Sequence, residues 1–286
     1  MSLYRPRELF AFLEAIDARP KKSLSQNFLI DGNIIGKLLD AIPSHEPILE
    51  IGPGPGSITE QLLKRGFKVH AVEKDPRLAN HLTRLEGGGA EECAQKCTGA
   101  LTFYNDDILT FDINLLPRPL HIVANIPFGI TTPILTRFIP LASHISSLTL
   151  IVQHEYAERL IAQPRTKAYS SLTLFLTFYA SCKYLFRIKP ACFSPKPKVS
   201  AAAVQIIPRA PLSTREGLFF QLVRTAFSMR RKQLKSSLRT LYAPEKIISA
   251  LESIGHKPTA RPEELTSEEY VSLVDALAPQ GPTRRA

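Results

Sequence analysis

The sequence predicts an α/β fold, with a seven-stranded, Rossmann-like sheet followed by a small all-helical domain. Short apolar runs, many of them β-branched, recur between residues 47 and 207 and alternate with helical patterns. This alternation is typical of a parallel sheet covered on both faces. After Pro208 the apolar residues recur only at helical spacing. We therefore expect a sheet-based domain at residues 1–209 and a helical domain at residues 210–286.

The predicted strands are short runs of apolar residues bounded by turn residues. They cover residues 47–52, 68–73, 101–106, 121–125, 147–153, 183–188 and 199–207. Between the first two strands lies a helical pattern, with Ser57 placed to cap the helix and Gly66 to end it. Only a proline-rich loop, residues 189–198, separates the last two strands. That loop has no room for a crossover helix, so the two strands should pair antiparallel at one edge.

The helical domain begins with a basic segment. No acidic residue lies between Glu216 and Glu245, and the pattern predicts a basic helix around residues 224–239. A run of charges is usually a solvated face, but so many cations without an acid favour contact with phosphates. The candidate contacts are Arg224, Arg230, Arg231, Lys232 and Lys235. Residues 244–255 and 266–277 are predicted as two further helices, the second with a capping box at Thr266.

Composition narrows the classes of protein and partner. The formal charge is +10 and the pI is near 9.5, which favours an anionic partner, nucleic acid before a membrane surface. No apolar run is long enough for a membrane span, and the N-terminus lacks the features of a secretory signal. The four cysteines match no zinc pattern. We expect free thiols, no metal and a cytoplasmic protein.

A glycine-rich loop follows the first predicted strand. Gly52, Gly54 and Gly56 let the backbone turn tightly and approach a ligand closely. The spacing is not that of a dinucleotide fingerprint, and no Lys-Ser/Thr pair follows as in a P-loop. By itself such a cluster is equally explained by a structural turn.

Polar residues at the ends of the next strands strengthen the case for a ligand site. Glu73 ends the second strand, Asp106 ends the third and is followed by Asp107, and Asn125 ends the fourth. Parallel strands present these ends at one edge, where open α/β sheets bind ligands. A carboxylate such as Glu73 suits two ribose hydroxyls, and no basic cluster is present to receive a phosphate. S-adenosylmethionine fits this pattern better than NAD or ATP.

Several motifs, taken in order, resemble one enzyme family. They are "KSLSQNFLID", "ILEIGPGPGSIT", "VEKD", "NDDIL", "NIPF", "QHEYAERL", "FSPKPKV" and "FSMRRKQLKSSL". Over residues 20–275 the chain resembles the KsgA-type ribosomal RNA adenine N6,N6-dimethyltransferases of the small subunit. The resemblance implies a methyltransferase sheet, S-adenosylmethionine as cofactor and an RNA-binding helical domain.

The resemblance also implies roles for individual residues. Asn27 and Leu29 correspond to residues that close over the cofactor, and Gly52 to the loop beside its methionine end. Glu73 corresponds to the ribose carboxylate and Asp107 to the group that faces the adenine amine. Asn125 corresponds to the asparagine of the catalytic motif.

The stretch "NIPF" predicts how the target base is held, although a strand end followed by a turn would also explain it. The Asn125 side-chain oxygen and the Ile126 carbonyl can accept both hydrogens of an adenine amine. Pro127 fixes the turn, and Phe128 offers a face for stacking. By resemblance, Phe193 is a second aromatic contact with the base. A core position is the alternative for that ring.

The leading hypothesis is dimethylation of two adjacent adenosines in a hairpin near the 3′ end of small-subunit ribosomal RNA. The partner would be this RNA within a pre-30S particle, and the enzyme a monomer. "NIPF" also occurs in erythromycin-resistance methylases, which modify large-subunit RNA, so that function is an alternative. A noncatalytic ribosome-assembly or transcription factor with the same fold is the third.

Overall fold

The computed structural model describes residues 3–20, 26–43, 46–82 and 100–278. The chain divides into two compact units. Unit 1 comprises Met1–Ala157 and Cys182–Pro208, and unit 2 comprises Glu158–Ser181 and Arg209–Ala286. The last division lies after Pro208, one residue before the expected domain boundary. Residues 158–181, expected in the first domain, are grouped with the second unit.

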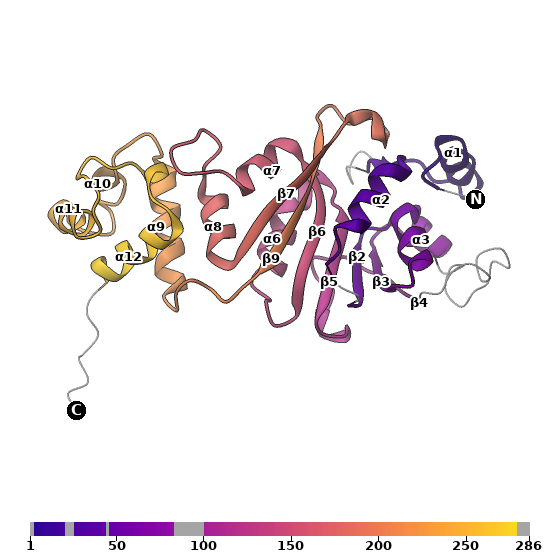
Figure 1. The fold of residues 1–286 in the computed structure, drawn as a ribbon, viewed down its shortest axis with the longest axis horizontal. Coiled ribbons are helices and arrows are strands. Elements are labelled where there is room, and N and C mark those ends of the chain that lie inside the picture. Colours follow the sequence, from indigo (N-terminus) through magenta and orange to yellow (C-terminus); the bar gives the residue numbers. More distant parts are fainter. Residues whose placement is uncertain (1–2, 21–25, 44–45, 83–99, 279–286) are drawn as a thin grey trace. The chain divides into compact units, whose positions relative to one another are not determined.

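A seven-stranded sheet in the order β4-β3-β2-β5-β6-β9-β7 forms the centre of unit 1 (Figure 1). The strands are β2 (Ile48–Ile51), β3 (Lys68–Glu73), β4 (Ala100–Asn105), β5 (Leu120–Asn125), β6 (Ile145–Gln153), β7 (Ala180–Ile188) and β9 (Ala201–Pro208). The first five strands of this sheet pair in parallel, whereas β9 runs antiparallel to β6. The predicted Rossmann-like sheet is confirmed, and its last two strands are neighbours at one edge.

Helices cover the sheet because their apolar sides match its buried residues. Those of unit 1 are α1 (Pro6–Ala15), α2 (Gly32–Asp40), α3 (Ser57–Lys64), α4 (Pro76–Leu82), α6 (Thr131–Phe138) and α7 (His154–Leu160), which extends into unit 2. Ile35 of α2 and Leu62 of α3 join Ile48 and Val123 of the sheet in one apolar core. All of β2 is buried, as expected for a strand covered on both faces.

The start of α3 differs from the sequence prediction. Gly56, not Ser57, occupies the capping position, with a left-handed backbone at φ +98°. Ser57 lies in the first turn, and its hydroxyl donates to the Leu3 carbonyl at 3.0 Å. The expected cap at Ser57 was therefore wrong, because the glycine turn already delivers the chain into the helix. Gly66 follows the end of the helix at φ +82°, as predicted.

A second, two-stranded sheet joins segments that are far apart in the sequence. β1 (Phe28–Leu29) pairs antiparallel with β8 (Phe193–Ser194), so that Leu29 lies opposite Phe193. Ile30 extends the ladder by donating its N–H to the Cys192 carbonyl at 2.8 Å. This pairing brings the "QNFL" segment against the proline-rich loop that precedes β9.

Unit 2 is helical and its core is aromatic. Its helices are α8 (Ser171–Tyr179), α9 (Glu216–Ser228), α10 (Leu234–Ser237), α11 (Pro244–Ser253) and α12 (Ser267–Leu277). Phe178 packs on Phe219 with ring centroids 4.4 Å apart, and Tyr270 is fully buried beside Phe219. The capping box predicted at Thr266 is present, with the Glu269 N–H donating to its hydroxyl at 3.2 Å.

The basic segment does not form the continuous helix expected around residues 224–239. The helix α9 ends at Ser228, and a turn precedes the single turn of α10. Leu234 donates its N–H to the Ala260 carbonyl at 2.8 Å and is fully buried. The prediction was wrong because this distant contact, invisible in the local pattern, redirects the chain.

Two further observations bear on the composition. Among the residues described, no helix is long and apolar enough to cross a membrane. Cys182 and Cys192 are free thiols, whereas Cys93 and Cys97 lie outside the described residues.

The burial of Glu50, in the middle of β2, leads to a prediction about stability. Its side chain is 1% exposed, and burial raises its pKa from 4.5 to about 8. The folded state therefore holds a proton that the unfolded chain releases above pH 4.5, so stability falls as the pH rises from 4.5 through 8. Glu50→Gln should flatten this pH dependence and stabilise unit 1 at pH 9 by on the order of a few kcal/mol.

Chemical unfolding of both proteins at pH 5 and pH 9 measures this difference. All other titrating groups are shared, so the pH dependence of the difference isolates Glu50. A constant difference between the two proteins across that range would contradict the buried, protonated state.

Candidate active site

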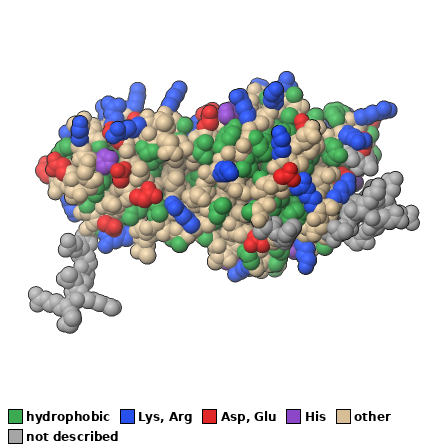
Figure 2. Space-filling view, in the orientation of Figure 1, with side chains coloured by type: hydrophobic (Ala, Val, Ile, Leu, Met, Phe, Trp, Pro, Cys, Tyr) green, Lys and Arg blue, Asp and Glu red, His purple; other side chains and the backbone are tan. Residues whose placement is uncertain are grey.

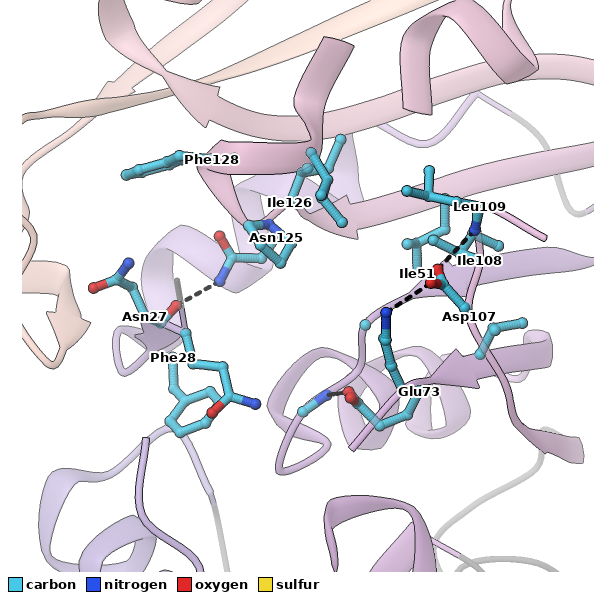
Figure 3. A pocket seen from close by; sticks show the side chains of 18 of the residues that line it. Asn27, Phe28, Ile51, Glu73, Asp107, Ile108, Leu109, Asn125, Ile126 and Phe128 are labelled. Carbon is cyan, nitrogen blue, oxygen red and sulfur yellow. Dashed lines mark hydrogen bonds and ion pairs between the residues drawn. The ribbon is translucent and has the colours of Figure 1, made fainter. Parts of the chain in front are cut away.

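The polar residues at the strand ends line one cavity. Because β4, β3, β2 and β5 are parallel neighbours, their carboxyl ends meet at the same edge. The cavity has a volume of about 320 Å³ (Figure 3). It is lined by residues from the strand ends, the "NIPF" turn and the "QNFL" segment: Gln26, Asn27, Phe28, Ile51, Gly52, Gly54, Val72, Glu73, Lys74, Asp106, Asp107, Ile108, Leu109, Asn125, Ile126, Pro127, Phe128, Gly129 and Ile130.

The glycine turn after β2 forms the floor of this cavity. Gly52 and Gly54 have φ of +65° and +59°, conformations that residues with a Cβ rarely adopt. At Gly52 an added Cβ would meet no atom within 4 Å, so the backbone borders open space. At Gly54 a Cβ would lie 3.1 Å from the Phe28 ring. The turn thus leaves room both for a ligand and for the "QNFL" segment.

Glu73 is held rigidly beside the turn. The Gly54 N–H donates to Oε2 at 3.0 Å and the Asp75 N–H donates to Oε1 at 2.8 Å. The side chain is 6% exposed, and burial raises its pKa. Each oxygen keeps a lone pair beyond these bonds, so the carboxylate can still accept from two ligand hydroxyls.

Asp107 is the second carboxylate of the cavity. It accepts from Lys74 Nζ at 2.7 Å and from the Leu109 N–H at 2.9 Å. The Lys74 hydrogen bond is the main reason why its pKa lies below the usual range. Ile51 and Ile108 lie on the same side of the cavity (Figure 3), which gives Asp107 an apolar surround suited to a flat ring.

The opposite side of the cavity is formed by the "NIPF" turn. Asn125 ends β5, and the Ile126 N–H donates to the Ile151 carbonyl at 3.2 Å, which continues the sheet by one residue. Pro127 then starts a tight turn in which its carbonyl accepts the Ile130 N–H at 3.0 Å. Phe128 is half-buried at this turn. In Figure 3 its ring lies on the side of the cavity to which the Asn125 oxygen points.

A segment near the N-terminus, residues 26–29, borders the cavity, and we call it the strap. The Asn125 Nδ2 donates to the Asn27 carbonyl at 2.8 Å. Phe28 packs in an apolar cluster with Leu9, Phe12 and Leu78. The strap is therefore fixed at Asn125, by α1 and α4, and by the pairing of β1 with β8.

Two predicted site residues are buried and do not line the cavity. Leu29 and Phe193 are each 2% exposed and belong to the apolar core that includes α2 and α3. Neither lines the cavity. The predicted contacts with cofactor and base therefore remain predictions for these two side chains.

Sequence reasoning did not single out several residues that line the cavity. Lys74 directly follows Glu73, and its charge beside a predicted carboxylate could have drawn attention to it. Phe28 lies within the quoted "QNFL" motif. Ile51, Val72, Ile108 and Leu109 are apolar residues next to strand ends, which no local pattern distinguishes from core residues.

The basic residues of unit 2 differ in their surroundings. Arg224, Arg231 and Lys232 are exposed, and Lys235 is half-buried. Arg230 is engaged within the unit. Its Nε lies 3.3 Å from Glu263, and its Nη atoms donate to the carbonyls of Lys167 at 2.9 Å and Thr166 at 3.0 Å.

No grouping of His, Cys, Asp and Glu among the described residues is suited to a metal ion.

The seven-stranded sheet, the glycine turn and the Glu73 carboxylate at the end of β3 define a Rossmann-like methyltransferase fold. The 23S rRNA methyltransferase ErmE has a similar structure, with a TM-score of 0.65 and 28% identity over 88% of this chain and 99% of that one. A dimethyladenosine transferase from Plasmodium falciparum matches with a TM-score of 0.72 and 24% identity over 86% of this chain and 95% of that one.

The family follows from the sequence. The model of the ribosomal RNA adenine dimethylase family matches residues 18–278, and the chain belongs to this family. Ribosomal RNA small subunit methyltransferase A of Protochlamydia amoebophila is 42% identical over 97% of this chain and 98% of that protein. The protein of the same name from Chlamydia muridarum is 41% identical over 94% of this chain and 96% of its own length.

The Lys74–Asp107 ion pair leads to a prediction about the pKa of Asp107. Lys74→Met removes the main cause of the low pKa of Asp107, so the Asp107 pKa should rise towards its ordinary value. An NMR titration of the Asp107 carboxyl measures this change. Lys68→Met, which removes an exposed lysine from the start of β3, the strand that Lys74 follows, is the matched control and should leave the Asp107 pKa unchanged. Equal titration curves for the two variants would refute the assignment.

Proposed function

We propose that the protein transfers methyl groups from S-adenosylmethionine to N6 of two adjacent adenosines in a 3′-terminal hairpin of small-subunit ribosomal RNA. The product would be N6,N6-dimethyladenosine, made in the cytoplasm during ribosome biogenesis by a monomer acting on a pre-30S particle. The observation that carries this proposal is the placement of Asn125, Ile126 and Phe128 at the end of a cavity whose other end holds Glu73 and Asp107. The high identity to small subunit methyltransferases A supports the choice of RNA.

The cavity fits S-adenosylmethionine by its chemistry. Glu73 has lone pairs for two ribose hydroxyls, and Asp107 can accept from an adenine amine beside Ile108. Gly52 leaves open space for the methionine portion. Among the described lining residues Lys74 is the one cation, and it pairs with Asp107, which disfavours a phosphate-bearing cofactor. When bound, S-adenosylmethionine supplies an electrophilic methyl group on a positively charged sulfur.

The protein's part in the reaction is to prepare the target amine. The lone pair of the adenine amine is delocalised into the ring, so the nitrogen is a poor nucleophile. Accepting both N–H groups at the Asn125 Oδ1 and the Ile126 carbonyl favours a tetrahedral nitrogen with its lone pair available. Phe128 would stack on the flipped base. Because alkylation makes the amine strongly acidic, no residue has to act as a general base, and positioning dominates.

The two units would divide the work. Unit 1 contains the cavity, and unit 2 carries the exposed cations Arg224, Arg231 and Lys232. Such cations suit the RNA backbone, which is recognised mainly by charge. We assign catalysis to the first unit and RNA binding to the second.

Methylation of large-subunit RNA is the second candidate function. The similarity to ErmE and the "NIPF" motif favour it. The test is a methyl-transfer assay on 30S and 50S particles from cells that lack both activities, with the modified base located by mass spectrometry. Dimethyladenosine at two neighbouring positions of 30S RNA is the expected result. Modification confined to 50S RNA would support the alternative, and no transfer to either particle would support a noncatalytic role.

The proposed stacking of Phe128 on the target base leads to a prediction. Phe128→Ala should remove about 1–3 kcal/mol of base stacking, which corresponds to roughly 5- to 150-fold in transfer efficiency. Phe128→Tyr keeps the ring and should stay within a few-fold. Phe128→Leu keeps apolar bulk, which matters because this side chain also packs against the core, but it loses the aromatic face. Single-turnover methylation should be as slow for Phe128→Leu as for Phe128→Ala. If Phe128→Leu is as fast as the wild type, Phe128 serves in packing and not in stacking.

The basic segment of unit 2 leads to a prediction about RNA binding. Neutralising the exposed residues Arg231 and Lys232 should lower the salt dependence of RNA affinity by about 0.7–0.9 in the log–log slope per lost phosphate contact. Arg230→Met should instead destabilise unit 2, by on the order of 1–3 kcal/mol, because Glu263 and two backbone carbonyls lose their donor. Salt titrations of RNA binding and chemical unfolding separate the two effects. An unchanged slope for the double variant would show that phosphate contacts lie elsewhere.

A further inference from the structure

The Asn125 side chain is connected to the strap by one hydrogen bond that spans 98 residues of sequence. Its Nδ2 donates to the Asn27 backbone carbonyl at 2.8 Å, and both residues line the cavity (Figure 3). The backbone at Asn125 is already fixed, because it pairs with Ile151 of β6 and the next N–H continues that ladder. What remains to be set is the direction in which the carboxamide points.

The chemistry of the carboxamide makes this bond directional. Its NH2 end only donates and its oxygen only accepts, while a backbone carbonyl only accepts. A flipped Asn125 would place two oxygens against each other in place of a hydrogen bond. The Asn27 carbonyl therefore requires the NH2 end to face the strap, and the oxygen to face the cavity on the side of Phe128 (Figure 3).

The Asn27 carbonyl is itself held in place by the strand pairing that follows it in the chain. Immediately after it, Phe28 and Leu29 pair with Ser194 and Phe193 in the two-stranded sheet. Leu29 and Phe193 are each 2% exposed within the apolar core. Such buried neighbours leave the strap little freedom to move relative to β5.

We propose that the strap is a positioning element for catalysis: the Asn27 carbonyl orients the Asn125 carboxamide so that its oxygen meets the target amine. This inference rests on the proposed function for the identity of the amine. It gives Leu29 and Phe193 a role without contact to either substrate, because they hold the peptide that orients Asn125. Asn27 and the β1–β8 pair then belong to the assembly of the acceptor as well as to the border of the cofactor cavity.

A backbone ester tests the proposal while leaving every side chain in place. Replacing Phe28 by its α-hydroxy acid analogue converts the Asn27–Phe28 peptide bond into an ester, whose carbonyl is a weaker acceptor. The same replacement at Ile30 is the matched control, since it removes the ladder bond to the Cys192 carbonyl but leaves the Asn27 carbonyl an amide. Single-turnover methylation at saturating S-adenosylmethionine and RNA reports transfer separately from binding.

The Phe28 ester should slow transfer at least about fivefold relative to the Ile30 ester, the fold-change expected for one neutral hydrogen bond. Asn125→Asp provides the second arm of a double-mutant cycle, because aspartate has no donor for the Asn27 carbonyl. In that background the Phe28 ester should cause no further slowing. Equal slowing in both backgrounds, or equal rates for the two esters, would overturn the proposal.

An NMR measurement on the wild-type protein tests the orientation of the Asn125 carboxamide without an activity assay. The Asn125 side-chain NH2, assigned by its loss in Asn125→Asp, should have one proton shifted downfield and protected from exchange. The Phe28 ester should reduce that shift, and the Ile30 ester should not. Two equivalent, rapidly exchanging protons in the wild type would refute the orientation even if methyl transfer to RNA is fully confirmed. A protected proton in a protein that methylates no RNA would instead leave the orientation standing and remove the proposed function.

Discussion

The burial of the Glu73 carboxylate is the constraint on which the glycine-turn side of the cavity depends. At 6% exposure this group needs hydrogen bonds to offset its lost hydration, and two backbone N–H groups supply them. One comes from Gly54, which can face the carboxylate because the turn adopts a positive φ. The other comes from Asp75, which caps α4 through the Arg77 N–H. One charge thus fixes both the glycine turn and the entry into the following helix.

The parts of the structure that follow from local chemistry could be predicted from the sequence. All seven sheet strands lie where apolar runs end in turn residues, and Glu73, Asp107 and Asn125 share the cavity because parallel strands end at one edge. The capping box at Thr266 was predictable because its donor and acceptor lie within one turn. In each case the residues that interact are close in sequence, or are brought together by a regular feature of the fold.

Contacts between distant segments account for the errors and omissions. After α9 ends at Ser228, Leu234 donates its N–H to the Ala260 carbonyl, a contact that the local helical pattern does not contain. The two-residue strands β1 and β8 are too short to leave a periodic signal, yet their pairing places Leu29 and Phe193 in the core. Arg230 has the same charge as its neighbour Arg231 in the sequence, and its ion pair with Glu263 could not be read from the local pattern. Composition and periodicity contain no information about such pairings.

The two sides of the cavity also differ in charge, and this difference explains the choice of an amide at residue 125. The Glu73 and Asp107 carboxylates accept hydrogen bonds from backbone N–H groups, and Asp107 also from Lys74. At residue 125 the neighbouring group is instead the Asn27 carbonyl, an acceptor. A carboxylate there would face a second oxygen without a donor between them, whereas asparagine satisfies the carbonyl with one end and offers an acceptor with the other. The strap therefore favours, at residue 125, a side chain that has both a donor for the Asn27 carbonyl and a free acceptor oxygen.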